Sequence, residues 1–282
     1  FIFCLFQPGA GVMIKMIAVD MDGTFLDDNK RYNKARFLQQ YQQLKQRGIK
    51  FVVASGNQYY QLISFFPEIR DEIAFIAENG ANIVDKGKTL FCGALSDAHL
   101  RRVLEVLAGI PYIHAVVCGP RSAYMLDTTP QPLLALMARH YHRLELRENF
   151  AALDDTIFKF SLNLNDEKIP ELMAHIGDAL EGIVTPVSSG FGFVDLIIPG
   201  VHKAHGLKLL QRQWQIADEE VVAVGDSGND IEMVAHAGFG FAMDNAQPGV
   251  KKVAGYHTES NNQQGALNVI ERVLAGSHPF NP

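Results

Sequence analysis

The sequence has 282 residues, with 25 basic and 31 acidic side chains that give a formal net charge of −6 at pH 7. This acidic balance argues against a nucleic-acid partner, which requires a basic face to neutralise phosphates, and no apolar run approaches the roughly 18 residues of a membrane span. Apolar residues make up 48% of the chain, so it can bury a sizeable core, and its length fits two domains better than one or three.

The start of the sequence and its cysteines bear on cellular context. Residues 1–12 are apolar and then rich in Gly and Pro, without a basic segment or an initial Met. We interpret them as a non-native or mis-started extension and not as a signal peptide. The three cysteines have spacings that suit neither a disulfide framework nor a zinc site, and we therefore expect a cytoplasmic protein; they are Cys4, Cys92 and Cys118.

The first part of the chain alternates strand and helix patterns. Residues 16–19 form a short apolar run that ends at a polar loop, which is typical of a strand buried on both faces. Apolar residues at helical spacing follow, and then another apolar run. Such an alternation predicts a parallel sheet with right-handed crossovers, whose chemistry lies at the carboxyl ends of the strands. In chain order we expect strands at 16–19, 49–54 and 73–77 and helices at 32–47 and 58–66.

The pattern changes between residues 86 and 197. Residues 157–164 alternate apolar and polar side chains, which predicts an antiparallel sheet covered on one face only. The parallel pattern then resumes with a helix at 203–213, a strand at 221–224 and a helix near 231–237. We therefore predict an α/β fold in which a Rossmann-like core (13–85 and 198–282) carries an inserted α/β cap domain (86–197). Inside the insert we expect helices at 97–108 and 132–142 and strands at 113–117, 123–126 and 157–164.

Two acidic loops follow apolar strands of the predicted core. The first reads Asp20-Met-Asp22-Gly-Thr and the second Gly-Asp226-Ser-Gly-Asn229-Asp230. In a parallel sheet both loops lie at one edge, where neighbouring carboxylates repel one another unless a cation compensates them. Mg²⁺ suits such a site because it takes oxygen ligands and needs few protein carboxylates. Their joint occurrence predicts a magnesium site.

Two further features gain weight from these loops. Ser55 and Gly56 follow the second predicted strand, and a Ser-Gly pair at a strand-to-helix junction offers a hydroxyl and backbone N–H groups to an anion. Lys203 begins a predicted helix. Several carboxylates gathered near a phosphate require a compensating positive charge beyond the metal, and this lysine can supply it.

These motifs, in this order, resemble those of the haloacid dehalogenase superfamily of phosphatases. The place and size of the insert, together with Glu78-Asn-Gly-Ala81 before it, resemble the Cof-type branch and its sugar phosphatases. The resemblance runs from Met13 to the C-terminus. Asn57 departs from it, because an Arg more often follows the Ser/Thr-Gly pair in that branch.

The resemblance implies an Mg²⁺-dependent hydrolase of small sugar phosphates. Asp20 would be the nucleophile that forms an aspartyl-phosphate and Asp22 the general acid and base. Asp20, the Asp22 backbone carbonyl and Asp226 would bind the metal. Asp230 would orient the groups around them. The phosphoryl oxygens would be held by Ser55, Gly56, Lys203 and Asn229.

The insert is expected to close over the pocket and select the leaving group, with Lys159 and Asn163 on the polar face of the 157–164 strand as candidate contacts. A solvated face explains those two residues equally well. We expect a small-molecule sugar phosphate as partner, and neither a nucleic acid nor a membrane. The oligomeric state stays open, a monomer being one option.

Three other classes of function stay under consideration. A sugar phosphotransferase or phosphomutase would use the same nucleophile but a sugar hydroxyl as acceptor. A phospho-accepting signalling domain also uses an Asp, Mg²⁺, a hydroxyl and a Lys, but it would be about half as long and would lack the insert. A non-catalytic sugar-binding module would leave the paired carboxylates without a role.

Overall fold

The structure is a computed structural model that describes residues 13–190 and 192–281. The interpretation of residues 1–12 lies outside the described residues. The described chain divides into two compact units. Unit one comprises 13–52, 210–226 and 233–281, and unit two comprises the described parts of 53–209 together with 227–232. These units do not follow the predicted domain boundaries, which stay a prediction.

Within the described residues, eight strands form one sheet, here called the core sheet, in the order β14-β13-β12-β1-β2-β3-β4-β5. Strand β1 pairs in parallel with β12, β12 with β13, and β13 with β14. Strand β4 pairs antiparallel with both β3 and β5. The α/β fold with a parallel core is confirmed, whereas the antiparallel β4 and β5 were not predicted. In chain order the strands are β1 (Met16–Val19), β2 (Lys50–Ala54), β3 (Ala74–Ala77), β4 (Asn82–Asp85), β5 (Lys88–Cys92), β12 (Val221–Gly225), β13 (Phe239–Met243) and β14 (Tyr256–Thr258).

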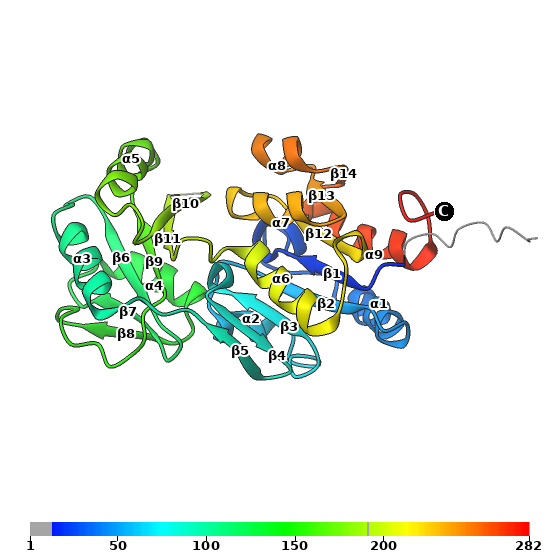
Figure 1. The fold of residues 1–282 in the computed structure, drawn as a ribbon, viewed down its shortest axis with the longest axis horizontal. Coiled ribbons are helices and arrows are strands. Elements are labelled where there is room, and N and C mark those ends of the chain that lie inside the picture. Colours follow the sequence, from blue (N-terminus) through cyan, green and yellow to red (C-terminus); the bar gives the residue numbers. More distant parts are fainter. Residues whose placement is uncertain (1–12, 191, 282) are drawn as a thin grey trace, which may run out of the picture. The chain divides into compact units, whose positions relative to one another are not determined.

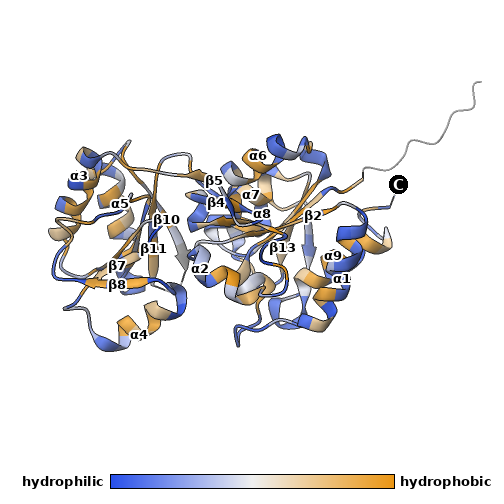
Figure 2. Ribbon diagram, turned by 90° about the horizontal axis from the view of Figure 1, so that it is seen from below, coloured by the Kyte–Doolittle hydropathy of each residue, from blue (hydrophilic) through white to orange (hydrophobic). Residues whose placement is uncertain are grey.

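Burial explains why the core strands are continuous apolar runs. Every residue of β1 and β12 is buried, as expected for a sheet covered on both faces. In Figure 2 the strands β2 and β13 are predominantly orange, while α1 alternates between blue and orange segments. The apolar runs thus become strands and the amphipathic segments become covering helices.

The six predicted helices lie close to their predicted positions, whereas α5, α8 and α9 were not predicted (Figure 1). Asn33 caps the first helix by accepting a hydrogen bond from Arg36 N. The helix expected at 58–66 is shorter, because α2 gives way to a 3₁₀ turn at Ile63–Phe65 before Pro67, which disfavours helix in the preceding residue. In chain order the helices are α1 (Lys34–Gln46), α2 (Tyr59–Leu62), α3 (Asp97–Ala108), α4 (Gln131–His140), α5 (Ile169–Ala179), α6 (Lys203–Trp214), α7 (Ile231–His236), α8 (Pro248–Val253) and α9 (Gly265–Ala275). Among the helices of the described residues, none has both the length and the apolar character needed to cross a membrane.

A second sheet of six strands, here called the insert sheet, occurs within unit two of the described chain, in the order β10-β11-β9-β6-β7-β8. Strand β9 pairs antiparallel with both β6 and β11, so the antiparallel expectation is confirmed. In chain order its strands are β6 (His114–Cys118), β7 (Ala123–Leu126), β8 (Leu144–Arg147), β9 (Lys159–Asn163), β10 (Thr185–Gly190) and β11 (Phe193–Ile197).

The expectation that this sheet is covered on one face only is wrong. Phe160 packs in a cluster with residues of α3 and α5, and residues of α4 pack in a second cluster with Val116 and Cys118 of β6. Lys159 and Ser161, on the polar side of β9, are only 1% and 5% exposed. The alternation misled because polar side chains can be buried where other polar groups satisfy them.

Candidate active site

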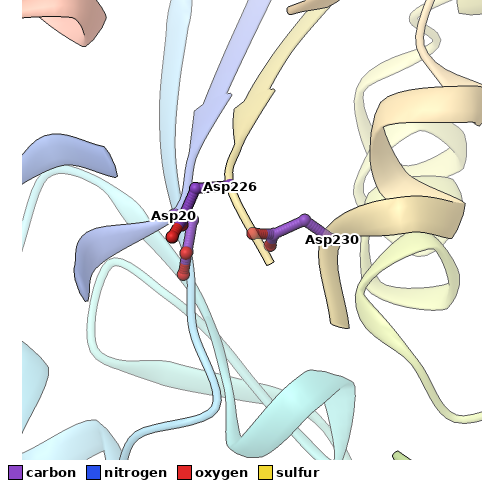
Figure 3. Close-up of side chains that lie close together, drawn as sticks. All are labelled: Asp20, Asp226 and Asp230. Atoms are coloured by element: carbon purple, nitrogen blue, oxygen red, sulfur yellow. The ribbon is translucent and has the colours of Figure 1, made fainter. Parts of the chain in front are cut away.

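Unit one contains an acidic pair. Asp20 follows β1 and Asp226 follows β12, and these strands pair in parallel, so their carboxyl ends lie at the same edge. The backbone N–H of Asp20 donates to the carbonyl of Val224 (3.1 Å), and the two residues each offer a carboxylate oxygen within 4.8 Å of the other's. Figure 3 shows the Asp20 and Asp226 side chains close together. Two ionised carboxylates this close repel one another, and a cation bound between them would relieve that repulsion.

The Gly-Thr that completes the first acidic loop orients Asp226. Gly23 has a φ of +75°, and a Cβ built there would collide with the Asp226 carboxylate. Thr24 Oγ1 donates to Asp226 Oδ1 (2.9 Å), and Asn245 Nδ2 donates to the Gly23 carbonyl (2.8 Å). Glycine is therefore required for the close approach as well as for the turn. Sequence reasoning found the turn but missed the role of Thr24.

Asp22 has a partner that sequence reasoning missed. Lys30 Nζ lies 3.0 Å from Asp22 Oδ1, with side chains 57% and 34% exposed. Exposed ion pairs contribute little to stability, so this pair adds little to the stability of the fold. Lys30 lies eight residues after Asp22 and belongs to no motif that would have identified it.

Unit two contains the predicted phosphate-binding residues. Lys203 and Asp230 form an ion pair with side chains that are fully buried (Nζ–Oδ1 2.6 Å), and Asp230 Oδ2 accepts from the backbone N–H of Ser227 (3.1 Å). Ser55, which is 3% exposed, accepts a hydrogen bond at Oγ from the backbone N–H of Asn57 (3.0 Å). Asp230 thus anchors Lys203, while the helical turn of the second acidic loop anchors Asp230.

The turn at residues 78–80 connects these elements within unit two. Its three residues have φ values of +54°, +60° and +109°. The Glu78 N–H donates to the Asn57 carbonyl and the Asn79 N–H to the Ser55 carbonyl (3.0 Å each). A Cβ on Gly80 would collide with the carbonyl of His202, next to Lys203. The left-handed turn therefore packs against both segments that are predicted to bind phosphate.

Two charged residues of the insert sheet, Lys159 of β9 and Asp195 of β11, contact this turn, Asp195 by accepting a hydrogen bond from Asn79 Nδ2. Lys159 Nζ lies 3.0 Å from Glu78 Oε1, and it donates to the Gly56 carbonyl (2.6 Å) and to Tyr141 Oη (3.3 Å). Burial raises the pKa of the Glu78 carboxyl, and Lys159 opposes that rise. Burial disfavours the charged amine of Lys159, but the Glu78 carboxylate beside it outweighs that effect and holds the pKa of the amine well above its usual range. We conclude that Lys159 is a buried cation.

The two candidate contacts of the insert have partners within unit two, and their contact with a substrate stays a prediction. Lys159 is not on a solvated face, and its charge is engaged by Glu78, while Asn163 Nδ2 donates to the Gly192 carbonyl (3.2 Å). Sequence reasoning assigned no role to Glu78, Asn79 or Asp195. The signal available for the first two was an Asn-Gly turn after an apolar strand.

The fold and these motifs define a phosphoric monoester hydrolase, and comparison with known proteins agrees. Residues 17–270 match the family model of haloacid dehalogenase-like hydrolases, and the chain belongs to this family, as a Cof-type phosphatase. It is 54% identical over 267 residues to the 5-amino-6-(5-phospho-D-ribitylamino)uracil phosphatase YbjI of Escherichia coli strain K12, covering 95% of this chain and 98% of that protein.

Two more distant proteins extend the likeness. YcsE of Bacillus subtilis strain 168, which carries the same phosphatase name, is 26% identical and is matched over 92% of this chain and 95% of its own. The crystal structure of SMU.1108c from Streptococcus mutans UA159 superposes with a TM-score of 0.89 at 34% identity, covering 93% of this chain and 99% of that one. The resemblance predicted from the motifs is thereby confirmed.

Proposed function

We propose that the protein hydrolyses phosphate monoesters of small polyhydroxylated molecules, in the presence of Mg²⁺, through an aspartyl-phosphate on Asp20. The observation that carries this proposal is the Asp20–Asp226 carboxylate pair, which is built around Gly23 and Thr24 in unit one. A pair of this kind serves a reaction in which a carboxylate approaches an anionic ester.

The residues around the pair suit Mg²⁺. Asp20 and Asp226 offer carboxylate oxygens and Asp22 a backbone carbonyl, so the donor set is all oxygen, which this ion prefers. Gly23 leaves the Asp226 carboxylate the space that a Cβ would fill. When bound, the ion supplies the positive charge that lowers repulsion between the nucleophile and the phosphoryl group.

The reaction follows from the roles assigned to the side chains. Asp20 attacks phosphorus as the bond to the leaving oxygen breaks, and Asp22 donates its proton to that oxygen. A water molecule then loses a proton to Asp22 and attacks the phosphorus of the aspartyl-phosphate, which releases inorganic phosphate and regenerates Asp20. Ser55, the Gly56 N–H, Lys203 and Asn229 hold the phosphoryl oxygens, since phosphoryl transfer depends mainly on positioning and on neutralising charge.

Pentose and hexose phosphates are the substrates that the motif resemblance favours, and the names of two relatives add a ribityl phosphate. All of these carry a phosphate ester on a polyhydroxylated carbon chain. We propose this chemistry as the substrate class, and the cytoplasm as the place of action. Assay of inorganic phosphate released from each compound, with Mg²⁺ present, ranks them. Repeating the assay with an added sugar acceptor distinguishes hydrolysis from phosphoryl transfer.

The nucleophile is tested by Asp20→Asn. This change keeps the shape of the side chain but removes the attacking charge, so turnover should be lost while the circular dichroism spectrum stays native. Asp178→Asn, on the exposed side of α5, is the matched control and should retain activity. Phosphatase activity in a folded Asp20→Asn variant would refute the assignment.

A further inference from the structure

A chain of hydrogen bonds runs from the insert sheet to the second acidic loop within unit two. Asn79 Nδ2 donates to Asp195 Oδ2 (2.8 Å), and Asn229 Nδ2 donates to Asn79 Oδ1 (3.0 Å). Ser227 Oγ then donates to Asn229 Oδ1 (3.2 Å). Asp195, Asn79 and Asn229 are 4%, 2% and 8% exposed. Water therefore has little access to the groups that set the direction of the chain.

The chemistry of these groups allows one orientation for each amide. An ionised carboxylate only accepts hydrogen bonds, and Asp195 Oδ2 accepts one from Asn79 Nδ2. Asn79 must therefore direct its NH₂ group at Asp195, which leaves its carbonyl oxygen facing Asn229. Asn229 in turn must present its NH₂ group to Asn79. The orientation of Asn229 is thus determined by a carboxylate on strand β11.

Gly56 lies against the same chain. A Cβ built on Gly56 would lie 3.2 Å from Asn79 Oδ1, 3.4 Å from Asp195 Oδ2 and 3.5 Å from Asn229 Nδ2. The backbone segment proposed to bind phosphate therefore packs directly on the three polar side chains. Orientation of Asn229 matters here because a phosphoryl oxygen accepts a hydrogen bond from an amide NH₂ and is repelled by an amide carbonyl.

We propose that Asp195 is a positioning residue for phosphate binding: through Asn79 it fixes the side-chain amide of Asn229, one N–H of which donates to Asn79 Oδ1 while the second serves the phosphoryl oxygens. The inserted segment then contributes to phosphate affinity as well as to the choice of leaving group. This inference rests on the proposed function, in which Asn229 binds the phosphoryl group.

Two substitutions test the chain. Asp195→Asn keeps the shape of the side chain but can present either an oxygen or an NH₂ group to Asn79. Asn79→Gly removes the intermediate amide and suits the backbone, because glycine adopts the φ of +60° found there without strain. Affinity for inorganic phosphate, measured by titration calorimetry with Mg²⁺ present, should fall roughly tenfold in each variant, as expected for loss of a hydrogen bond to a charged group.

The double variant separates a relay from independent effects. Residues that act through one chain are not additive, so Asp195→Asn combined with Asn79→Gly should bind phosphate no more weakly than the weaker single variant. Ser161→Ala is the matched control, because Ser161 is buried and pairs in register with Asp195 on the neighbouring strand. It should leave phosphate affinity unchanged.

Several outcomes would overturn the inference. Wild-type phosphate affinity in folded Asp195→Asn would do so, as would a change confined to substrate preference, which would make Asp195 a contact of the leaving group. If the fold losses of phosphate affinity in the two single variants multiply in the double variant, the two residues act independently, which would also contradict a relay. If Asp195→Asn does not fold, Asn79→Gly decides alone, since wild-type affinity in that variant excludes the chain. Failure of the proposed function is distinguishable, because the wild-type protein would then release no phosphate from any ester.

Discussion

The buried pair of Lys159 and Glu78 allows a prediction with a defined magnitude. Both side chains are 1% exposed, and methionine in place of Lys159 has similar length but no charge. Lys159→Met therefore leaves a buried carboxylate without its cation, and removing one partner of such a pair typically lowers the free energy of unfolding by about 3–5 kcal/mol. The Gly56 carbonyl loses its hydrogen-bond donor in the same step.

The loss should depend on pH in a specific direction. Burial raises the pKa of the Glu78 carboxyl above its ordinary value of 4.5, and without Lys159 it must rise further. A group whose pKa is higher in the folded state contributes stability at pH values below its unfolded pKa and loses that contribution as pH rises through its folded pKa. The destabilisation by Lys159→Met should therefore be smallest near pH 4.5 and should grow toward neutral pH.

Urea-induced unfolding followed by circular dichroism at several pH values measures this effect. Combining Lys159→Met with Glu78→Gln removes the unpaired charge and should recover most of the loss at pH 7, leaving only the cost of the missing hydrogen bonds. Lys168→Met is the control, because Lys168 pairs with Glu171 at 3.5 Å on the exposed surface, where a pair is worth about 0–1 kcal/mol. A loss that has no pH dependence, or that Glu78→Gln does not relieve, would refute the reasoning.

Four further predictions concern the first acidic loop, the metal and Gln58. Gly23→Ala forces a Cβ into the Asp226 carboxylate, so kcat should fall by roughly 100-fold, measured by phosphate release at saturating substrate; near-normal kcat would contradict this. Thr24→Val removes the hydrogen bond to Asp226 and should raise the Mg²⁺ concentration needed for half-maximal activity. Treatment of the wild-type protein with EDTA should abolish activity, and added Mg²⁺ should restore it. Gln58→Leu removes two hydrogen bonds, both 2.9 Å, to the backbone of Arg143, and urea unfolding should show a loss of about 1–3 kcal/mol.

The parts of the fold that depend on continuous apolar runs were predictable from sequence. The strands expected at 16–19 and 221–224 correspond to β1 and β12 almost residue for residue. Strand β5 was missed because Lys88 and Thr89 are exposed and interrupt any apolar pattern. Strand β13 was missed because glycine, which lowers strand propensity, stands at its second position. A strand that is stabilised mainly by pairing with its neighbours need not show a strand pattern in its own sequence.

Some residues of the candidate site were likewise predictable from sequence, and others were not. Asp20 and Asp226 were predicted because each follows a recognisable strand, and the sheet brings such strand ends to one edge. Lys159 was noticed but assigned to a solvated or substrate-facing surface, because alternation reports which side of a strand a residue occupies and not what covers that side. Asp195 was missed because one acidic residue in an apolar strand identifies no partner.

The left-handed turn at residues 78–80 accounts for the burial of the Glu78 and Lys159 charges. A non-glycine residue at a positive φ costs about 1–3 kcal/mol, so glycine at position 78 would relieve strain, but it would leave the buried amine of Lys159 without its carboxylate. Asn79 tolerates the left-handed region better and supplies both a donor and an acceptor, which are used toward Asp195 and Asn229. Buried ionic groups of this kind contribute little net stability, but they permit few alternative arrangements. The turn thus accepts strain in exchange for a single arrangement of the groups that pack against Gly56 and Asn229.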